Sequence, residues 1–300
     1  MSLTGEEIAS QPACWREAAA LAATSDLLLP HPGEHVAALG CGTSWFVAQA
    51  YAGRRGELDL ARGVTDPFTP TELPPARSFD RSVVISRSGT TTEAIDVVKR
   101  FQMEAIKTSV ITAVADSPLA AEAGHLVVLD FADEKSVVQT RFATSTLALL
   151  RASLGEDLAP AIADAERALE MPLPHDPTGF DHFVFLGHGW SVGLAHEAAL
   201  KLREACQAHT ESYPAMEYRH GPISVAGPST LVWILGTPDA RITEDIAETG
   251  ATVRMGELDP MAELVCIHRT AVALAEARGL DPDRPRHLTR SVVLQEEGTA

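Results

Sequence analysis

The sequence predicts an α/β fold of two tandem domains, each a doubly wound parallel sheet in a three-layer α/β/α arrangement. Short β-branched runs alternate with helix-length stretches along the 300-residue chain, which is typical of a parallel sheet covered by helices on both faces. The pattern Leu-Gly-x-Gly-x-Ser occurs at 39–44 and again at 186–191, about half the chain apart. An apolar run precedes each copy and a helical pattern follows it, so we expect two copies of one domain.

The elements of the first copy follow in order along the chain. A helical pattern between Thr4 and Leu21, broken near Pro12, precedes them. Strands are predicted at 35–39, 82–85, 109–114 and 126–129, and helices at 44–51 and 91–106. The segment 171–179 contains three prolines and is predicted to be the linker.

The second copy is predicted to contain strands at 183–186, 231–235 and 264–267, with helices at 191–206 and 269–278. An extended tail follows. The predicted plan is therefore an N-terminal helix at 1–24, a first domain at 25–170, a linker at 171–180, a second domain at 181–280 and a tail at 281–300.

Composition excludes several classes of function. The formal net charge of −17 argues against nucleic acid or an anionic membrane surface as a partner. No apolar run reaches the roughly 18 residues that a membrane span needs. The acidic N-terminus lacks the order of a signal peptide, so we expect a cytoplasmic protein. Four widely spaced cysteines form no CxxC pair and predict no disulfide framework.

The segment 86–93, Ser-Arg-Ser-Gly-Thr-Thr-Thr-Glu, carries the clearest chemical signal. It follows a predicted strand and opens a predicted helix, where ligands bind in open parallel sheets. Gly89 allows close backbone approach, Arg87 adds positive charge, and hydroxyl groups add donors at Ser86, Ser88, Thr90 and Thr91. An ordinary capped turn would also use serine and threonine, but four hydroxyls exceed what capping needs. We expect a phosphate site.

A second strand-to-helix loop, Gly-Cys-Gly-Thr-Ser at 40–44, precedes it. A dinucleotide fingerprint would need glycine at 45, which is Trp45 here, and an isolated Gly-x-Gly is weak evidence. We interpret Ser44 as a second donor to the same phosphate.

The loop after the repeat in the second half, 189–193, also matches Gly-x-Ser-x-Gly, the nucleophile elbow of hydrolases. Asp239, Asp245, His268 and His287 could complete a triad with its serine. No HGGG-type oxyanion loop is visible, and the repeat accounts for the first glycine and Ser191, so we disfavour a hydrolase.

Glu197, Lys201 and Glu204 share one face of the predicted helix at 191–206. On pattern alone a solvated salt-bridge ladder is the favoured interpretation, and His220 is favoured as a loop histidine bonded to backbone. The other histidines show no metal-ligand spacing, so we predict no metal and no cofactor.

In order and spacing, these motifs resemble the double SIS (sugar isomerase) domain family. The chain is most similar to the isomerase half of glucosamine-6-phosphate synthase and to stand-alone amino-sugar-phosphate isomerases, deaminases and deglycases. The resemblance covers about 15–294 and rests on segments 40–44, 85–91, 134–144, 185–189, 197–204, 217–222 and 285–290. It implies two flavodoxin-like SIS domains.

The resemblance implies roles for individual residues. Glu204 is implied as the base that moves a proton between C1 and C2 of the open-chain sugar. His220 is implied to assist ring opening from the neighbouring subunit, so we expect a homodimer with a shared site. Lys201 and Arg290 complete the implied catalytic set, although the role of Lys201 stays open. The implied sugar-phosphate site comprises Gly42, Thr43, Ser44, Ser86, Arg87, Ser88, Thr91, Val137 and Gln139.

The chain departs from the family pattern in three places. Only a short helical segment precedes the first domain, so we expect no glutaminase domain. The family's Schiff-base lysine corresponds to Arg290, and no lysine follows Lys201. Arginine stays protonated at working pH and cannot form an imine. Gln139, Thr140 and Arg141 replace a Ser-Thr-Lys stretch, which should alter hydroxyl recognition.

We therefore expect a sugar-phosphate isomerase or deaminase acting on an open-chain (amino)hexose 6-phosphate. A fructosamine-6-phosphate deglycase with the same base is a second interpretation. A non-catalytic sugar-phosphate-binding regulator is the third, favoured by the missing lysine and disfavoured by the pairing of Glu204 with His220.

Overall fold

The computed structural model describes residues 2–58, 63–237 and 239–294, and these contain two parallel sheets. The first sheet has the order β2-β1-β3-β4-β5. Its strands are β1 (Val36–Gly40), β2 (Thr65–Phe68), β3 (Arg81–Ile85), β4 (Lys107–Thr112) and β5 (His125–Val128). The second sheet has the order β7-β6-β8-β9, with β6 (His182–Gly187), β7 (His209–Pro214), β8 (Thr230–Leu235) and β9 (Thr252–Met255). The two sheets therefore share one strand order, as the repeat predicts.

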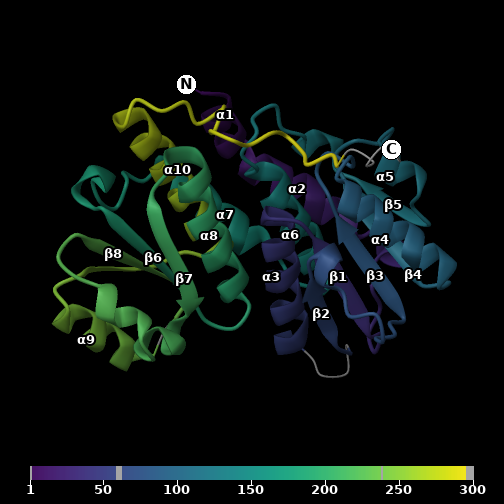
Figure 1. Ribbon diagram of the computed structural model, residues 1–300, viewed down its shortest axis with the longest axis horizontal. Helices are drawn as coiled ribbons and strands as arrows, with labels where there is room; N and C mark the ends of the chain where they lie inside the picture. Colours follow the sequence, from purple (N-terminus) through teal and green to yellow (C-terminus); the bar gives the residue numbers. More distant parts are fainter. Residues whose placement is uncertain (1, 59–62, 238, 295–300) are drawn as a thin grey trace, which may run out of the picture.

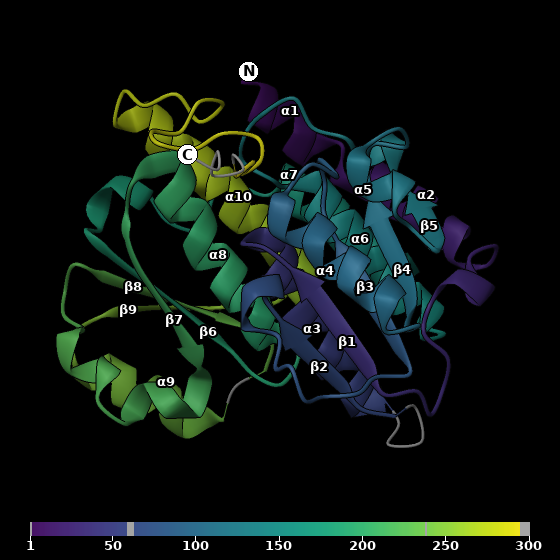
Figure 2. The ribbon, with the colours of Figure 1, turned by 45° about the vertical axis from the view of Figure 1, so that its right-hand side comes forward.

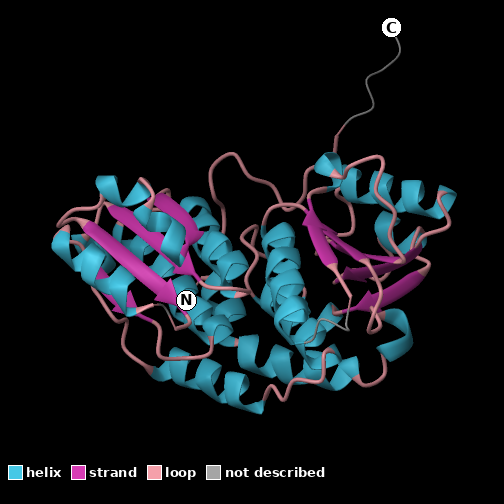
Figure 3. Cartoon of the chain, turned by 90° about the horizontal axis from the view of Figure 1, so that it is seen from below, coloured by secondary structure: helices cyan, strands magenta, loops and turns pink. Residues whose placement is uncertain are grey.

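Helices cover both faces of each sheet (Figure 1). Between the sheets lie α2 (Gln11–Ala22), α3 (Thr43–Leu58), α6 (Arg141–Ser153), α7 (Ala159–Glu170), α8 (Ser191–Cys206) and α10 (Pro260–Ala277). Seen from below, these helices form the middle of the molecule (Figure 3). The outer faces carry α4 (Thr92–Met103), α5 (Pro118–Ala121) and α9 (Ala240–Glu248), and α1 (Leu3–Ala9) begins the chain. Two three-layer α/β/α units in tandem confirm the predicted fold class.

The strands direct alternate side chains into different cores. Val83 and Ile85 of β3 point inward and share the largest core with Phe183 and Phe185 of β6. Val84 faces the opposite way, into a separate core against α4. This alternation follows from the two-residue period of a strand. The inner faces of both sheets and the helices between them therefore form one continuous core.

The repeated pattern is explained by one strand-turn-helix geometry. A Cβ atom added at Gly40 would lie 2.5 Å from the carbonyl carbon of Ser44, and one added at Gly187 would lie 2.5 Å from that of Ser191. Real Cβ contacts are not this short, so each strand must end in glycine for the helix to start so close. The repeat thus preserves the strand-to-helix junction in both halves.

The helices α3 and α8 cross closely at the junction between the two halves (Figure 2). A Cβ atom added at Gly193 would lie 2.5 Å from the backbone nitrogen of Ala50, so only glycine permits this approach. The crossing brings the first turn of α3 next to the last turns of α8. The two loops predicted to bind phosphate and the predicted catalytic helix therefore meet.

One predicted element is wrong. The segment 264–267, predicted as a strand, lies inside the 18-residue helix α10, and the helix predicted at 269–278 is its second half. Asp259 caps this helix by accepting from the Met261 backbone N–H, and Pro260 starts it. Almost every residue of 261–268 is buried, so the apolar run shows no helical face.

Several elements were not predicted at all, among them β2, β7, β9 and the helices α6, α7 and α9. The predicted break near Pro12 falls at Ser10 instead, because Pro12 lies in the first turn of α2, where its missing N–H costs nothing. Over the described ranges, no helix combines the length and hydrophobicity that crossing a bilayer would take.

Candidate active site

Hydroxyl groups from two loops meet at the carboxyl ends of β1 and β3. Ser44, Ser86 and Ser88 are each less than 10% exposed and line a cavity of about 30 Å³. The hydroxyls of Ser44 and Ser86 make no hydrogen bond within the described part of the chain, and Ser88 Oγ accepts from the Thr90 amide at 3.2 Å. The Ser44 and Ser86 hydrogens are therefore available to an anion in this cavity.

Backbone amides and a helix end face the same place. Thr91 is the N-cap of α4 but its side chain makes no capping bond, and it lines this cavity and the larger one beside it. The amides of Ser88, Gly89 and Thr91 donate to no other described residue. Free amides at a helix N-terminus attract anions.

The larger cavity, of about 200 Å³, adjoins the first and contains the predicted base. Lys201 and Glu204 of α8 form one wall, and the C-terminal tail at 288–292 forms another. The remaining wall residues come from three loops and the first turns of α3 and α4: Cys41, Gly42, Thr43, Thr91, Glu93, Val137 and Gln139.

Lys201 is buried and surrounded by oxygen atoms. Its Nζ donates to Thr43 Oγ1 at 2.9 Å and to Glu204 Oε2, and lies 3.7 Å from Glu197 Oε1. Burial alone would lower the pKa of Lys201, but the Glu204 and Glu197 carboxylates outweigh it and raise that pKa. Lys201 therefore stays an ammonium, which can donate hydrogen bonds but cannot attack a carbonyl.

Glu204 is the most accessible member of this ion-pair cluster. Its side chain is 19% exposed, whereas Lys201 and Glu197 are each 1% exposed. The carboxylate thus combines access to the cavity with a fixed orientation, the two properties that a general base needs.

Cys41 lines both cavities, and burial with the charge of Glu93 raises its pKa to about 11. It therefore remains a thiol near neutral pH.

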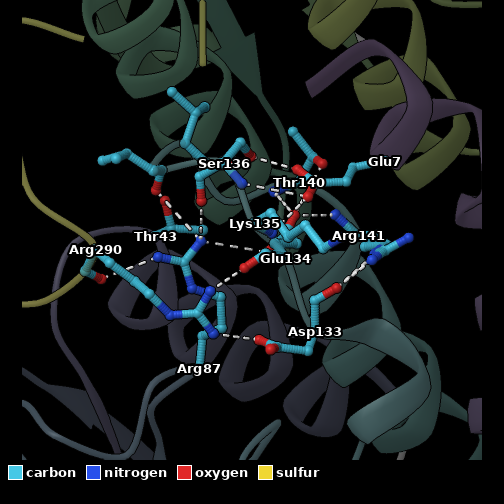
Figure 4. Close-up of polar contacts among 12 residues, drawn as sticks. Glu7, Thr43, Arg87, Asp133, Glu134, Lys135, Ser136, Thr140, Arg141 and Arg290 are labelled. Atoms are coloured by element: carbon cyan, nitrogen blue, oxygen red, sulfur yellow. Dashed lines mark hydrogen bonds and ion pairs between the residues drawn. The ribbon is translucent and has the colours of Figure 1, made fainter. Parts of the chain in front are cut away.

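Arg87 lies behind the phosphate loop and binds protein groups. Its side chain is 1% exposed and donates to the carbonyls of Ser136, Val137 and Arg290 at 2.9–3.3 Å. It lies 3.6 Å from the fully buried Glu134 carboxylate (Figure 4). Burial raises the pKa of Glu134, which Arg87 and Thr140 partly offset. Although Arg87 lines the small cavity, two of these three hydrogen bonds hold the loop that builds the site and the third holds the tail.

The loop at 133–141 is fixed from both ends of the chain (Figure 4). Glu7 of α1 accepts from the backbone of Lys135 at 2.6 Å and from the Ser136 hydroxyl. Glu134 accepts from the Thr140 amide and hydroxyl at 2.5 and 2.9 Å. Gln139, between these anchors, is thereby placed in both cavities.

Arg290 anchors the C-terminal tail across the site. Its guanidinium donates to the Glu134 carbonyl and to Asp133 Oδ1. Beyond it, Ser291 Oγ accepts from Thr90 Oγ1 at 2.8 Å, and the Val292 carbonyl accepts from the Thr92 amide at 3.3 Å. The tail, yellow in Figure 1, consequently runs from α10 over to the first sheet.

The structure brings all but one of the predicted site residues to these two cavities. The exception is His220, which is exposed at the end of the short helix η6 (Ala215–Arg219) and lines neither cavity of its own chain. Sequence reasoning missed Cys41, Glu93 and the tail residues 288, 289, 291 and 292. Glu93 ends the phosphate-loop motif, so its position beside that loop was the available signal.

The nucleophile-elbow alternative lacks its geometry. The Ser191 hydroxyl has its one hydrogen directed to backbone carbonyls, Leu235 at 2.8 Å or His188 at 2.9 Å, and it accepts from the His188 amide. No histidine side chain forms a hydrogen bond with it within the described ranges. His268 lies beside Glu197 instead, at 3.6 Å.

The corresponding loop of the second half holds a carboxylate of the first half. Glu57 of α3 accepts from the Trp190 amide at 2.8 Å, at the start of α8. Two guanidinium groups approach the Trp190 ring, Arg54 at 5.5 Å and Arg151 at 4.8 Å from its centroid. The loop borders a cavity of about 560 Å³, but the Glu57 carboxylate that lines it would repel a phosphate at this position.

If Ser86 and Ser88 bind a phosphate, replacing both with alanine should weaken sugar-phosphate binding by about a hundredfold or more, because each bond to a charged group contributes ~1.5–3 kcal/mol. Calorimetric titration with glucosamine 6-phosphate would measure this. Unphosphorylated glucosamine should bind both proteins equally poorly. The exposed Ser229→Ala variant is the matched control, and unchanged affinity in the double variant would place the phosphate elsewhere.

No protein-family model matches the chain, but related proteins and structures do. The glutamine–fructose-6-phosphate aminotransferase of Sulfurisphaera tokodaii is 26% identical over 303 residues, which cover 87% of this chain and 50% of that protein. A crystal structure of glucosamine-6-phosphate deaminase from Thermotoga maritima superposes with a TM-score of 0.81 at 25% identity, covering 98% of this chain and all of the other. The C-terminal domain of the Francisella tularensis aminotransferase gives 0.83 at 18% identity, covering 95% and 98%.

In fold and in sequence the chain is similar to double SIS (sugar isomerase) proteins. Its homologues are the isomerase regions of glutamine–fructose-6-phosphate aminotransferases, and the chain spans about half the length of those it matches.

Proposed function

We propose that the protein is a phosphosugar enzyme that moves a proton between C1 and C2 of an open-chain hexosamine 6-phosphate, as an isomerase or deaminase. The observation that carries this proposal is the pair of adjoining cavities, one lined by the hydroxyl and amide cradle and the other by the carboxylate of Glu204. The likeness to a glucosamine-6-phosphate deaminase supports the same substrate class.

The residues suggest how the proton transfer would work. With the phosphate held by Ser44, Ser86 and Ser88, the sugar chain would extend along the cavity toward α8. Glu204 would remove the proton next to the carbonyl or imine, a weak acid that a carboxylate deprotonates only at close range. The Lys201 ammonium and the Thr43 hydroxyl would stabilise the oxygen that gains charge in the intermediate.

The cavity favours a substrate that carries an amine. Glu93 Oε2 and Gln139 Oε1 are buried acceptors without a hydrogen-bond partner among the described residues, and both side chains line the cavity with Glu204. An ammonium or amino group would supply the missing donors. A substrate with its own nitrogen also needs no enzyme Schiff base, which fits Arg290 at the position of the family lysine.

We expect Glu93→Gln to lower affinity for glucosamine 6-phosphate by about tenfold while leaving fructose 6-phosphate unchanged, because only the former presents a cation to the carboxylate. Competition binding of the two sugars measures the ratio. Asp96→Asn, an exposed change of the same charge on the same helix, is the control. An equal loss for both sugars would mean that Glu93 does not recognise the nitrogen.

Because His220 lies outside the cavities of its own chain, we propose that a second copy supplies it in a homodimer. His220→Ala and Glu204→Gln should each be nearly inactive. Mixed and re-annealed in equal amounts, they should regain about a quarter of the wild-type sites, because half of the dimers are mixed and each has one intact site. No recovery, although mixed dimers are detected by mass, would contradict a shared site.

The deciding experiment is proton NMR in D2O with the 6-phosphates of fructose, glucosamine, galactosamine and a fructosamine. Exchange at C1 or C2, with a ketose, ammonia or a free amine as product, would separate isomerase, deaminase and deglycase. Binding without exchange would favour the non-catalytic regulator. The Arg290 guanidinium also supports that alternative, because it already donates to the Glu134 carbonyl and to Asp133. The proposal would be contradicted if the protein bound none of these sugars and exchanged no proton in any of them.

A further inference from the structure

A network of buried polar side chains extends from the ion-pair cluster of α8 into the middle of the molecule. Its members come from four helices, α2, α6, α8 and α10, and each exposes 1% or less of its surface: Gln11, Trp15, Thr144, Glu197, Lys201 and His268. Polar groups at this depth are costly unless they are paired. Apart from Lys201, none of them has a role in the proposed reaction.

The orientation of the Gln11 amide follows from the groups around it. Trp15 Nε1 can only donate, and it donates to Thr144 Oγ1 at 2.8 Å. The single hydrogen of the Thr144 hydroxyl has Gln11 Oε1 at 2.8 Å as its nearest acceptor, with the Thr140 and Arg141 carbonyls at 3.2 and 3.4 Å. The Ile8 carbonyl fixes the amide, because it lies 3.2 Å from Gln11 Nε2 and excludes the flipped orientation.

The same amide nitrogen sets the tautomer of His268. Gln11 Nε2 lies 3.4 Å from His268 Nδ1, so Nδ1 must present its lone pair. The ring hydrogen is therefore on Nε2, which faces Glu197 Oε2 at 3.6 Å. This distance is too long for a hydrogen bond, but a hydrogen on Nε2 still attracts the Glu197 carboxylate, because the buried surroundings screen charge poorly.

Glu197 depends on this contact. Neither of its oxygens has a hydrogen-bond partner in the described parts of the chain, and the groups facing them are Lys201 Nζ at 3.7 Å and His268 Nε2 at 3.6 Å. Without the His268 N–H, the buried carboxylate would be compensated by Lys201 alone. The ammonium would then be drawn toward Glu197 and away from Glu204 and Thr43.

We propose that His268, with its tautomer set by Gln11, is a positioning residue that holds Glu197 from one side so that the Lys201 ammonium stays on Glu204. The inference rests on the proposed function for its effect on turnover. The predicted tautomer of His268 does not depend on any substrate.

The tautomer can be measured on the full chain by two-bond 1H–15N correlation of 15N-labelled histidines. His268→Gln identifies the resonance by its disappearance. We expect hydrogen on Nε2 only. Hydrogen on Nδ1 would overturn the proposal, whether or not a sugar phosphate is turned over. Absence of turnover would count against the proposed function and not against the tautomer.

Turnover supplies the second test. His268→Leu should lower kcat by about ten- to a hundredfold with KM within about twofold, because the base is misplaced while the phosphate cradle is intact. His268→Gln should restore most of kcat, since its amide can accept from Gln11 and donate toward Glu197. His268→Asn, one carbon shorter, should not.

Thr270→Val is the matched control, because it removes a buried hydroxyl from the same helix that bonds only within that helix. It should change stability alone. Wild-type kcat in His268→Leu would overturn the proposal. If that variant does not fold, the glutamine and asparagine variants still decide, since equal kcat in both would overturn it as well.

Discussion

Replacing Glu204 with glutamine is expected to lower proton exchange at C1 and C2 by about 10³-fold, while sugar-phosphate affinity changes little. The amide keeps the shape of the side chain but cannot accept the proton. Lys201, which now donates to Glu204, keeps its bond to Thr43 and its contact with Glu197, so the wall of the cavity should hold its form.

Loss of the C1 or C2 proton signals in D2O measures the exchange rate, and calorimetry measures affinity. Glu248→Gln, an exposed change of the same kind on α9, is the control and should behave as wild type. Full exchange in Glu204→Gln with normal binding would rule out Glu204 as the base.

The second large effect is on stability. Arg87→Met should lower the free energy of unfolding by about 3–5 kcal/mol, the usual cost of removing one partner from a buried ion pair. The change leaves Glu134 buried without its cation and deprives the carbonyls of Ser136, Val137 and Arg290 of a donor. The 133–141 loop and the tail should loosen together.

The penalty of Arg87→Met should depend on pH. Burial raises the pKa of Glu134 above its ordinary value of 4.5, and loss of Arg87 would raise it further. A raised folded-state pKa means that the folded protein holds the proton more tightly than the unfolded chain, so stability is retained at low pH and lost as the pH rises. The difference from wild type should therefore be smaller near pH 4.5 than near about pH 8.

Urea unfolding at both pH values tests this expectation. Arg100→Met, which breaks an exposed pair with Glu104 on α4, should cost only ~0.5 kcal/mol at either pH. Equal stability of Arg87→Met and wild type would mean that Arg87 does not hold the loop.

The sequence predicts the fold well where periodicity and junctions are local. The α8 bounds at 191–206 match the prediction, because a glycine-serine junction starts the helix and Gln207 ends it in a left-handed conformation. The same reasoning fails at 264–267. There a helix buried on all sides offers no polar face, and its capping signal, Asp259 before Pro260, carried more information than its apolar run.

The site was partly predictable for a similar reason. The i, i+3 and i+4 spacing of Glu197, Lys201 and Glu204 places them on one helix face, and the structure confirms this clustering. Arg290 bonds the Glu134 carbonyl across 156 residues, and Glu7 bonds Ser136 across 129. No local pattern encodes such contacts, so the anchoring of the loop and tail becomes visible only once the chain is folded.

The Glu57 carboxylate at the start of α8 bears on the history of the molecule. Duplication of one ligand-binding domain would give a chain with two equivalent sites. Here a side chain of the first copy occupies the loop of the second, and its neighbours Arg54, Arg151 and Trp190 make that loop a joint between the copies. We therefore expect one sugar phosphate per chain at saturation. The loop of the first half would bind it, whereas the equivalent loop of the second half would only set the angle of α8.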